Sequence, residues 1–489
     1  MKKKYFLYIV IAGILLFFSI PAFHLLKTYW NEDEIRTVVP KGYTNDASGL
    51  NLTKVDSIID VPHSKEAIEE QLKELLAFSK MKQIPLSIAG AKHSMGGHTM
   101  YPDGIVVNMR PYNHMKLDGD VLTVGSGALW EEVINYLDKY KKSVAIMQAF
   151  SSFSVGGSMS VNGHGWQKNA PPMSSSVLSF TLMKADGEIV TCSRTENKEL
   201  FSLVIGGYGL FGIILDVKLK VVDNENLNFN RFKFESTKYL SYFRRYARDD
   251  EKAKLVFGRL NISEKDFLEY ATLNVFTSSK TPLSDAQKPE HSQKSNEIKR
   301  IIFRSTVNSE YGKRLRWDLE TELSKFSSDE NFSRNEVLND NVALIENKDS
   351  TSTDILQEYF IPERNFNEYI QALKKDLRNT QIDLLNITIR DVYQDHDSYM
   401  NYARENVFGF VFLFNQKKNP EDEEAMKKLT QKLVQTAIRM EGTYYLPYRL
   451  HVEKEAMRKA YPQSDAFFQL KLKYDPDQIF KNKFYDYYK

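Results

Sequence analysis

ADGEIVTCSRTENKELFSLVIGGYGLFGIILDVKLKV, residues 185–221, is the stretch that decides the fold. With the apolar LSFTLMK before it, this stretch predicts a β-hairpin that turns at Asp186 and Gly187. A helix follows over residues 197–207, and GIILDVKLKVV then alternates apolar and charged residues. That segment predicts a half-buried strand, with its apolar face formed by Leu215, Val217, Leu219 and Val221.

The same stretch contains a formal GxGxxG pattern at Gly207, Gly209 and Gly212. A Rossmann dinucleotide site needs a strand before these glycines and a helix after them, so that the pyrophosphate meets a helix N-terminus. Here a helix precedes the glycines and a strand follows them. The order excludes a Rossmann site, so any cofactor is held in another way.

A second glycine cluster, SVGGSMSVNGHG, covers residues 154–165. Gly156 and Gly157 have no Cβ, so the backbone there could approach an anion closely and point its amides at the oxygens. A pair of tight turns would use the same residues. The cluster alone leaves both interpretations open.

A third cluster, AGAKHSMGGH, covers residues 89–98 and follows the short apolar strand predicted for IPLSIAG. His93 therefore lies in a polar loop at a strand end, where a core-packing role is improbable. It could be a general base, or it could join a metal site. The metal alternative requires histidines that match no helical ligand spacing, namely His93, His98, His114 and His164.

Composition limits the possible functions of this chain. At 489 residues it exceeds one ordinary core, so two domains or a large insertion are expected. The 66 Lys and Arg residues against 64 Asp and Glu give a net charge of +2 without a dense basic stripe, which argues against a nucleic-acid partner. Cys192 is the only cysteine, so an intrachain disulfide and a cysteine-based zinc site are excluded.

The N-terminal sequence predicts a single membrane anchor over residues 1–28. After MKKK, the apolar run from Tyr5 to Leu26 is long enough to cross roughly 30 Å of hydrocarbon as a helix. The lysines before it and the acidic residues 32–34 after it place the N-terminus in the cytoplasm and the body outside. A cleaved signal peptide is the alternative, although residues 19–22 form a poor cleavage site.

Beyond residue 222 the segments become longer and more polar. Residues 278–300 have too little apolar content to fold alone and indicate a surface loop, a lid or disorder. Order returns at QEYFIP, which precedes a helix, an alternating strand at residues 385–389, the apolar VFGFVFLF and a last helix. This order predicts an antiparallel sheet with helices on one face.

Together, the three glycine clusters resemble the FAD-binding domain of the vanillyl-alcohol oxidase and p-cresol methylhydroxylase family. The resemblance covers about residues 55–222 and includes PLSIAGAKHS, DVLTVGSGALWEEVINYL, SVGGSMSVNGHG and the opening stretch. It implies an α+β fold in which FAD lies between two subdomains, with an inserted α+β substrate cap. The domain limits expected from it are 36–222 for the FAD-binding domain, 223–442 for the cap and 443–489 for a C-terminal segment that returns to the flavin.

The resemblance also assigns cofactor-binding residues. It implies that two loops contact the pyrophosphate, formed by Gly90, Ala91, Lys92, His93 and Ser94 and by Val155, Gly156, Gly157 and Ser158. It implies that the closing strand lines the flavin or adenine through Gly212, Ile213 and Ile214.

His93 occupies the position that many relatives bond to the flavin 8α carbon, which implies covalent FAD. A neutral imidazole is a nucleophile, and such a bond would retain the cofactor and raise its potential. Some relatives add a second bond from a cysteine before the Val-Gly-Gly loop. This chain has Ser151, Ser152 and Ser154 there and its cysteine elsewhere, which rules out double attachment.

The C-terminal residues 442–463 and 470–482 resemble the sugar-oxidising branch, which includes aldonolactone and alditol oxidases and the decaprenylphosphoryl-ribose oxidase. The resemblance places Arg449 and His451 near the reactive flavin nitrogen as catalytic residues, although a surface loop would also accommodate them. Arg390, on the alternating strand, is either solvent-exposed or a group that holds an acidic substrate.

These features predict a membrane-anchored, FAD-dependent oxidoreductase that oxidises a CH–OH group of a sugar, lactone or lipid-linked alcohol. Hydride would pass to flavin N5, with oxygen or a quinone as the final acceptor. One alternative is reduction of a carbon–carbon double bond, as in membrane-bound sterol reductases. Another is a non-catalytic, membrane-tethered binding protein.

Overall fold

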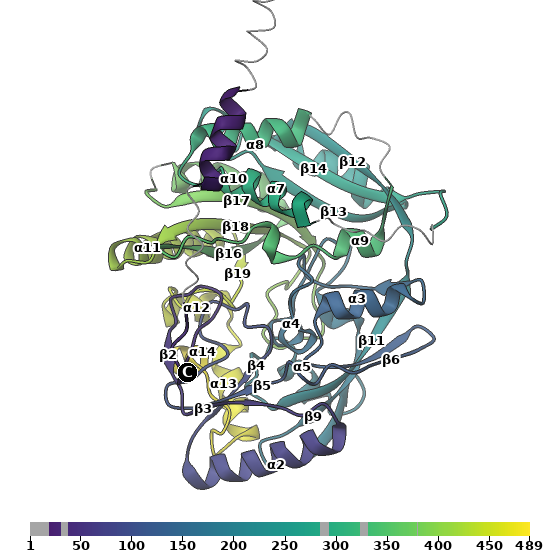
Figure 1. Cartoon of the computed structure of the whole chain (residues 1–489), viewed down its shortest axis with the longest axis vertical. Coiled ribbons are helices and arrows are strands. Elements are labelled where there is room, and N and C mark those ends of the chain that lie inside the picture. The colour runs from purple at the N-terminus through teal and green to yellow at the C-terminus, as the bar shows by residue number, and fades with distance from the viewer. Residues whose placement is uncertain (1–18, 31–37, 284–292, 323–330, 379) are drawn as a thin grey trace, which may run out of the picture.

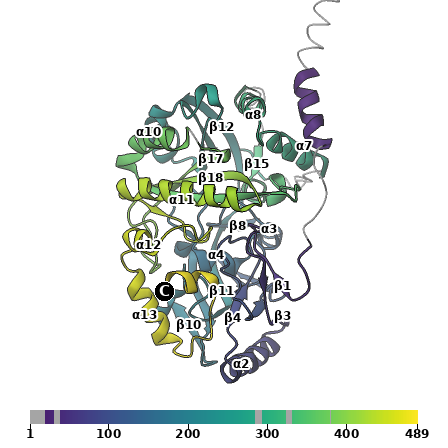
Figure 2. The ribbon, with the colours of Figure 1, turned by 90° about the vertical axis from the view of Figure 1, so that its left-hand side faces the viewer.

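The computed structural model describes residues 19–30, 38–283, 293–322, 331–378 and 380–489. Two halves are stacked along the long axis of the molecule (Figure 1). The first part of the chain and the C-terminal helices form the lower half, and the middle of the chain forms the upper half, here called the cap. The 90° view shows the same stacking (Figure 2).

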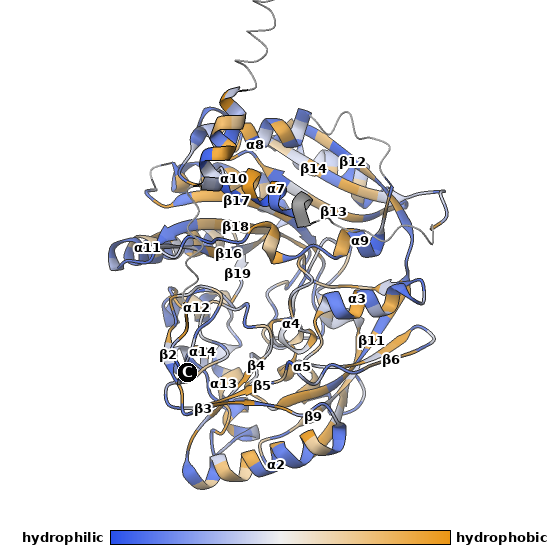
Figure 3. Cartoon of the chain, in the orientation of Figure 1, coloured by the Kyte–Doolittle hydropathy of each residue, from blue (hydrophilic) through white to orange (hydrophobic). Residues whose placement is uncertain are grey.

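The lower half contains two main sheets. A parallel three-stranded sheet has the order β3-β5-β4, formed by Ser57–Asp60, Ile105–Asn108 and Leu86–Ala89. Helix α2, Lys65–Lys82, packs Ile68, Leu72 and Leu76 against this sheet. Apolar and polar residues alternate along α2, as its amphipathic packing requires (Figure 3).

The second sheet is antiparallel and contains the stretch that decides the fold. Its order is β10-β9-β11-β7-β6, formed by Ile189–Ser193, Val177–Met183, Ile213–Asp223, Val121–Gly125 and Met115–Asp118, with β8, Lys142–Val144, paired to β11. Three helices accompany these strands, α3 (Trp130–Asp138), α4 (Val155–Val161) and α5 (Lys198–Val204). The short strands β1 and β2 pair at Tyr43–Thr44 and Thr53–Lys54.

The expected hairpin, helix and strand follow one another as the sequence predicted. Strands β9 and β10 turn at Gly187, whose amide donates to the Lys184 carbonyl over 3.0 Å. Helix α5 precedes the glycines, and β11 follows them. Gly212 has φ +144°, and a Cβ there would lie 2.6 Å from the Met183 carbonyl oxygen, so this junction requires glycine.

The cap is built on one antiparallel sheet of order β15-β12-β14-β13-β17-β18-β16-β19. The strands span, in chain order, Asn226–Glu235, Ala253–Leu260, Tyr270–Ser278, Asn331–Ser333, Ser352–Pro362, Asp383–Val392, Val407–Lys417 and Thr443–Tyr444. Helices α10, Phe366–Leu377, and α11, Pro420–Arg439, pack on one face, where Ile387 and Phe412 contribute to the main core. This part agrees with the predicted antiparallel sheet.

Helices also lie against the other face of the cap sheet, which the sequence analysis did not predict. Phe303 of α7, Gln293–Arg304, packs against Leu385 and Leu413, and α8, Glu310–Glu322, follows it. Part of the segment expected to be a loop is therefore helical. Its few apolar residues are enough to hold a helix in place because the cap sheet buries them. The short helices α6 and α9 span Tyr239–Phe243 and Arg334–Leu338.

The C-terminal helices α12 (Lys454–Ala460), α13 (Ser464–Tyr474) and α14 (Lys483–Tyr488) pack along the lower half (Figure 2). The Lys481 amide donates to the Leu86 carbonyl over 3.0 Å, and Ser87 Oγ donates to the Lys481 carbonyl over 2.6 Å. The segment thus returns beside the strand that leads to His93.

A buried ion pair holds this return, and its removal is expected to destabilise the protein. Asp475 contacts the fully buried Lys471 ammonium and accepts from the Ile479 and Phe480 amides over 2.9 and 2.8 Å. Asp475→Ala should lower the free energy of unfolding by about 3 to 5 kcal/mol, because it leaves a buried charge unpaired. Urea denaturation measures this loss. Asp477→Ala, which removes an exposed pair with Lys80, is the control and should cost less than about 1 kcal/mol.

The predicted anchor lies mostly outside the described residues, because residues 1–18 are not among them. Residues 19–30 are helical and contact the cap, where His24 Nε2 lies 2.9 Å from the Ser305 carbonyl oxygen and its ring meets Tyr311 edge-on. Within the described ranges, no helix is both long and apolar enough to cross a bilayer.

Candidate flavin and substrate site

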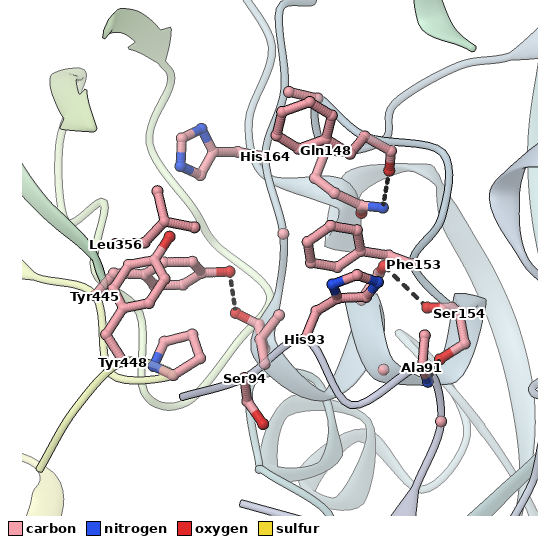
Figure 4. A pocket seen from close by; sticks show the side chains of 18 of the residues that line it. Ala91, His93, Ser94, Gln148, Phe153, Ser154, His164, Leu356, Tyr445 and Tyr448 are labelled. Carbon is pink, nitrogen blue, oxygen red and sulfur yellow. Dashed lines mark hydrogen bonds between the residues drawn. The ribbon is translucent and has the colours of Figure 1, made fainter. Parts of the chain in front are cut away.

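A cavity of about 400 Å³ lies between the lower half and the cap. Its floor is formed by the loop after β4, the start of α4 and the glycine turn before β11, and its roof by strands β16, β17 and β18. The C-terminal segment closes one side through Tyr445, Pro447 and Tyr448. Figure 4 shows His93, Phe153 and Ser154 on one side of the cavity and Leu356, Tyr445 and Tyr448 on the other.

Most of the predicted cofactor residues line this cavity. The structure brings together Gly90, Ala91, Lys92, His93, Ser94, Gly156, Gly157, Ser158, Gly212 and Ile214. Val155 and Ile213 do not line it, because both side chains are fully buried in the cores. Lining residues that sequence reasoning missed include Ser126, Gln148, Phe150, Phe153, Tyr208 and Gly209. Of these, Gly209 carried a signal, since it belongs to the glycine turn.

The two loops expected to hold a pyrophosphate meet at Ser154. Its hydroxyl accepts from the Ala91 amide over 3.3 Å, and a Cβ on Gly90 would lie 2.0 Å from the same oxygen. We expected the Gly156 amide to point at the anion. It donates instead to the Ser126 carbonyl over 2.8 Å. Bare backbone that a Cβ would fill fits close approach by an extended anionic cofactor.

His93 is held in the geometry that a nucleophilic imidazole needs. Its ring stacks on Phe153 with centroids 4.1 Å apart, and Nε2 lies 3.2 Å from the Ser152 carbonyl oxygen. A carbonyl only accepts, so this contact places the proton on Nε2 and the lone pair on Nδ1. Burial lowers the pKa of His93, although the Ser152 contact opposes the shift, and the ring is neutral near pH 7. Cys192 is buried in β10 and does not line the cavity.

A second histidine pairs with a carboxylate on the cavity wall. His164 Nε2 lies 2.6 Å from Glu358 Oε1, and the two side chains are 4% and 2% exposed. The ring is not aligned for a hydrogen bond to that oxygen, and neither ring nitrogen has a hydrogen-bond partner within the described ranges. Tyr448 donates to Glu358 Oε2 over 3.4 Å, and Arg390 Nη1 donates to the His164 carbonyl over 3.2 Å.

The charge state of Glu358 follows from its neighbours. Burial alone would raise the pKa of this carboxyl, but His164, Arg390 and Tyr448 outweigh it and hold the pKa below its usual range. Glu358 is therefore an anion at neutral pH, in contact with the imidazole ring of His164. This pair was not found from the sequence, because a single Glu on an apolar strand gives no signal.

The four histidines considered for a metal do not converge. His114 lies 2.9 Å from Asp216, and His98 packs between Tyr208 and Phe484. His93 and His164 have the separate partners described above. The part of the chain that the structure describes contains no group of three histidine, cysteine or acidic side chains able to hold a metal ion.

Arg449 and His451, expected to be catalytic, do not line the cavity. Both contact Glu423 at the start of α11, with Arg449 Nε and His451 Nε2 at 3.2 and 2.8 Å from its Oε1. His451 Nδ1 lies 3.1 Å from Thr430 Oγ1. Arg449 and His451 thus lie in a polar cluster beside the site, whereas Arg390 lines the cavity.

Glu423→Gln is expected to destabilise the protein in a pH-dependent way. Burial opposes ionisation of Glu423, but His451 and Arg449 lower its pKa to about 2. Because this pKa is depressed in the folded protein, the carboxylate stabilises it above about pH 4.5, and the contribution is lost as pH falls toward 2. The variant should lose on the order of 3 kcal/mol at neutral pH and respond less to acid. Urea denaturation at several pH values tests this, with Glu424→Gln as the exposed control.

Comparison with known proteins supports the cofactor assignment. Residues 66–193 match the family model described as FAD binding domain. The chain is 31% identical to cytokinin dehydrogenase 3 of Arabidopsis thaliana over 211 residues, which cover 41% of this chain and 39% of that protein. It is 33% identical to cytokinin dehydrogenase 3 of Oryza sativa subsp. japonica over 157 residues, 30% of each chain. An uncharacterized oxidoreductase in the fasciation locus of Rhodococcoides fascians is 23% identical over 235 residues, 47% of this chain and 52% of that protein.

These matches confirm that the chain contains an FAD-binding domain with FAD as its cofactor. The chain spans about two fifths of the length of the Arabidopsis relative that it matches. None of these three relatives is named as a sugar oxidase, so membership of the sugar-oxidising branch stays a prediction.

Proposed function

We propose that this chain, whose residues 66–193 match an FAD-binding domain, is an FAD-dependent oxidoreductase that acts on a small molecule held between that domain and the cap. The observation that carries the proposal is the buried pair of His164 and Glu358 on the cavity wall. A buried ionised carboxylate in contact with an imidazole is costly to maintain, and such pairs serve acid–base chemistry.

The chain's own residues would hold the cofactor and move one proton. FAD, when bound, supplies a two-electron acceptor for hydride. The loops at Gly90–Ser94 and Gly156–Ser158 would hold the cofactor, and His93 would form the covalent bond through Nδ1. As a substrate C–H bond gives up its hydride, His164 accepts the proton from the neighbouring O–H or N–H, and the Glu358 anion stabilises the imidazolium that forms.

Two bonds are candidates for oxidation. The C-terminal resemblance supports a CH–OH group of a sugar, lactone or lipid-linked alcohol. The names of the two cytokinin dehydrogenases support a CH–NH group instead. His164 serves both, because each reaction releases one hydride and one proton.

Anaerobic reduction of the flavin tests the proposal. The purified protein should be yellow, and its flavin absorbance should bleach with one class from a panel of alcohols and secondary amines. Bleaching by a nicotinamide alone would instead support the carbon–carbon double-bond reductase. A colourless protein that takes up no FAD would contradict every enzymatic assignment and leave a binding protein.

Membrane attachment and the electron acceptor belong to the same proposal. The apolar run at residues 5–26 supports a single anchor with the body outside the cytoplasm, and this location would suit a quinone or oxygen as acceptor. Membrane fractionation of the full chain against residues 30–489 tests the anchor. Recovery of both forms in the soluble fraction would contradict it.

A further inference from the structure

Two arginines from the cap, close to each other and to Glu320, line the cavity. Arg259 of β13 and Arg316 of α8 both line the cavity, together with Asn386 and Thr388 of β17. Arg316 is only 8% exposed, and its guanidinium lies over the Phe303 ring at 4.6 Å. Cations in such a wall carry a desolvation cost that must be balanced by a partner.

Among the described residues, the acidic partner of these arginines, Glu320, does not balance their positive charge. Glu320 contacts Arg259 and lies 2.9 Å from Arg316 Nε, while Arg231 Nη1 donates to the Glu320 backbone carbonyl. Within the described part of the chain, three guanidinium groups face one carboxylate, which leaves two positive charges in this part of the cluster. The nearby Lys313 is neutralised by Asp383 at 2.9 Å and adds no further charge.

Some N–H donors of Arg259 and Arg316 also remain for a ligand in the cavity. Arg316 donates through Nη1 to the Leu385 carbonyl at 3.1 Å and through Nη2 to Asn386 Oδ1 at 3.3 Å, and each of these two nitrogens carries a second N–H. Arg259 Nε is buried and has no partner in the ranges that the structure describes. Buried guanidinium donors without partners are uncommon, and an oxyanion is the group that satisfies them best.

The spacing of residues along β17 gives the distance between the arginine cluster and the proposed site of oxidation beside His164. Asn386, Thr388 and Arg390 line the same cavity from alternate positions, and Arg259 is paired in register with Thr388. Arg316 contacts Asn386, whereas Arg390 contacts the His164 carbonyl. Four residues along a strand span about 13 Å. The intervening wall is apolar and includes Phe257, Leu356, Val411 and Leu413.

We propose that Arg259 and Arg316 bind an oxyanion, a carboxylate or a phosphate, at one end of an elongated substrate whose other end is oxidised beside His164 and Glu358. The orientation rests on the proposed function, whereas the anion site itself does not. Glu358, which also lines the cavity, does not compete for this site, because it is paired with His164.

Ligand binding without turnover tests this site. Decanoate, decyl phosphate and decanol share one apolar chain and differ in the head group, and calorimetry on the holoprotein carrying His164→Gln gives each Kd. We expect either acid to bind at least about tenfold more tightly than decanol, and the tighter acid identifies the head group. Equal binding of all three ligands would overturn the site. Failure of the proposed oxidation would not, because no turnover is measured.

Substitutions of opposite sign separate charge from structural damage. Arg259→Gln should reduce the preference for the acid about tenfold, and Arg259→Lys should retain part of it. Glu320→Gln removes the competing carboxylate, so the acid should bind more tightly, whereas a merely damaged cap would bind it more weakly. Arg439→Gln, an exposed arginine on α11, is the matched control. An unchanged preference in Arg259→Gln, or weaker acid binding in Glu320→Gln, would contradict the proposal.

Discussion

Replacement of His93 by alanine is expected to release the flavin from the denatured polypeptide. In the wild type the ring is neutral, stacked on Phe153 and oriented by the Ser152 carbonyl, so Nδ1 carries the free lone pair. These are the conditions for attack on the electrophilic 8α carbon of an oxidised flavin. Acid precipitation followed by flavin fluorescence of the pellet measures the attached fraction, which should fall from nearly complete to background.

The variant should still bind FAD noncovalently, since the loops around Ser154 are unchanged. His63→Ala, at an exposed histidine before α2, is the control and should retain the attached flavin. Flavin that stays attached in His93→Ala would show that the bond is elsewhere. A wild type that releases its flavin on denaturation would show that no bond is formed.

Replacement of His164 by glutamine is expected to slow flavin reduction by a factor of roughly 100 to 10,000, the usual contribution of a positioned base. Glutamine keeps a polar side chain of similar size beside Glu358 but cannot accept the substrate proton. Anaerobic stopped-flow spectroscopy measures the reduction rate and, from its dependence on substrate concentration, the Kd. The rate should fall while the Kd changes little, because the proton moves only in the transition state.

Glu358→Gln should lower the same rate, because glutamine stabilises the His164 imidazolium less than a carboxylate does. This variant therefore tests whether Glu358 acts through His164. His98→Gln is the matched control, because His98 lines the same cavity and is as buried as His164. Burial lowers the pKa of His98 to about 3, so it takes no proton near neutral pH. Equal losses in His98→Gln and His164→Gln would mean that packing, and not proton transfer, explains the effect.

Several assignments were readable from the sequence because their signals are local. Glycine positions, the alternation along β11 and the order of helix before strand located loops that line the cavity and excluded a Rossmann site. The resemblance then placed His93 on the cavity wall. Val155 and Ile213 were assigned with their neighbours, but both belong to the buried faces of α4 and β11, and a motif does not state which way each of its residues points.

Arg449 and His451, by contrast, do not line the cavity. The C-terminal segment reaches the cavity, which Tyr445 and Tyr448 line. The two basic residues contact Glu423 instead, because α11 begins beside them and offers a carboxylate. Such a contact depends on how a helix packs on the cap sheet, and no spacing in the sequence reports it.

The sequence by itself determined the FAD-binding architecture and the loop that carries His93, because turns, periodicity and glycine requirements act over a few neighbouring residues. Only the tertiary structure decided which side chains line the cavity. His164 meets Glu358, and Arg259 meets Glu320, through contacts between elements far apart in the chain. The physical reason is that strand register and helix packing orient these side chains, and both are set by burial across the whole molecule.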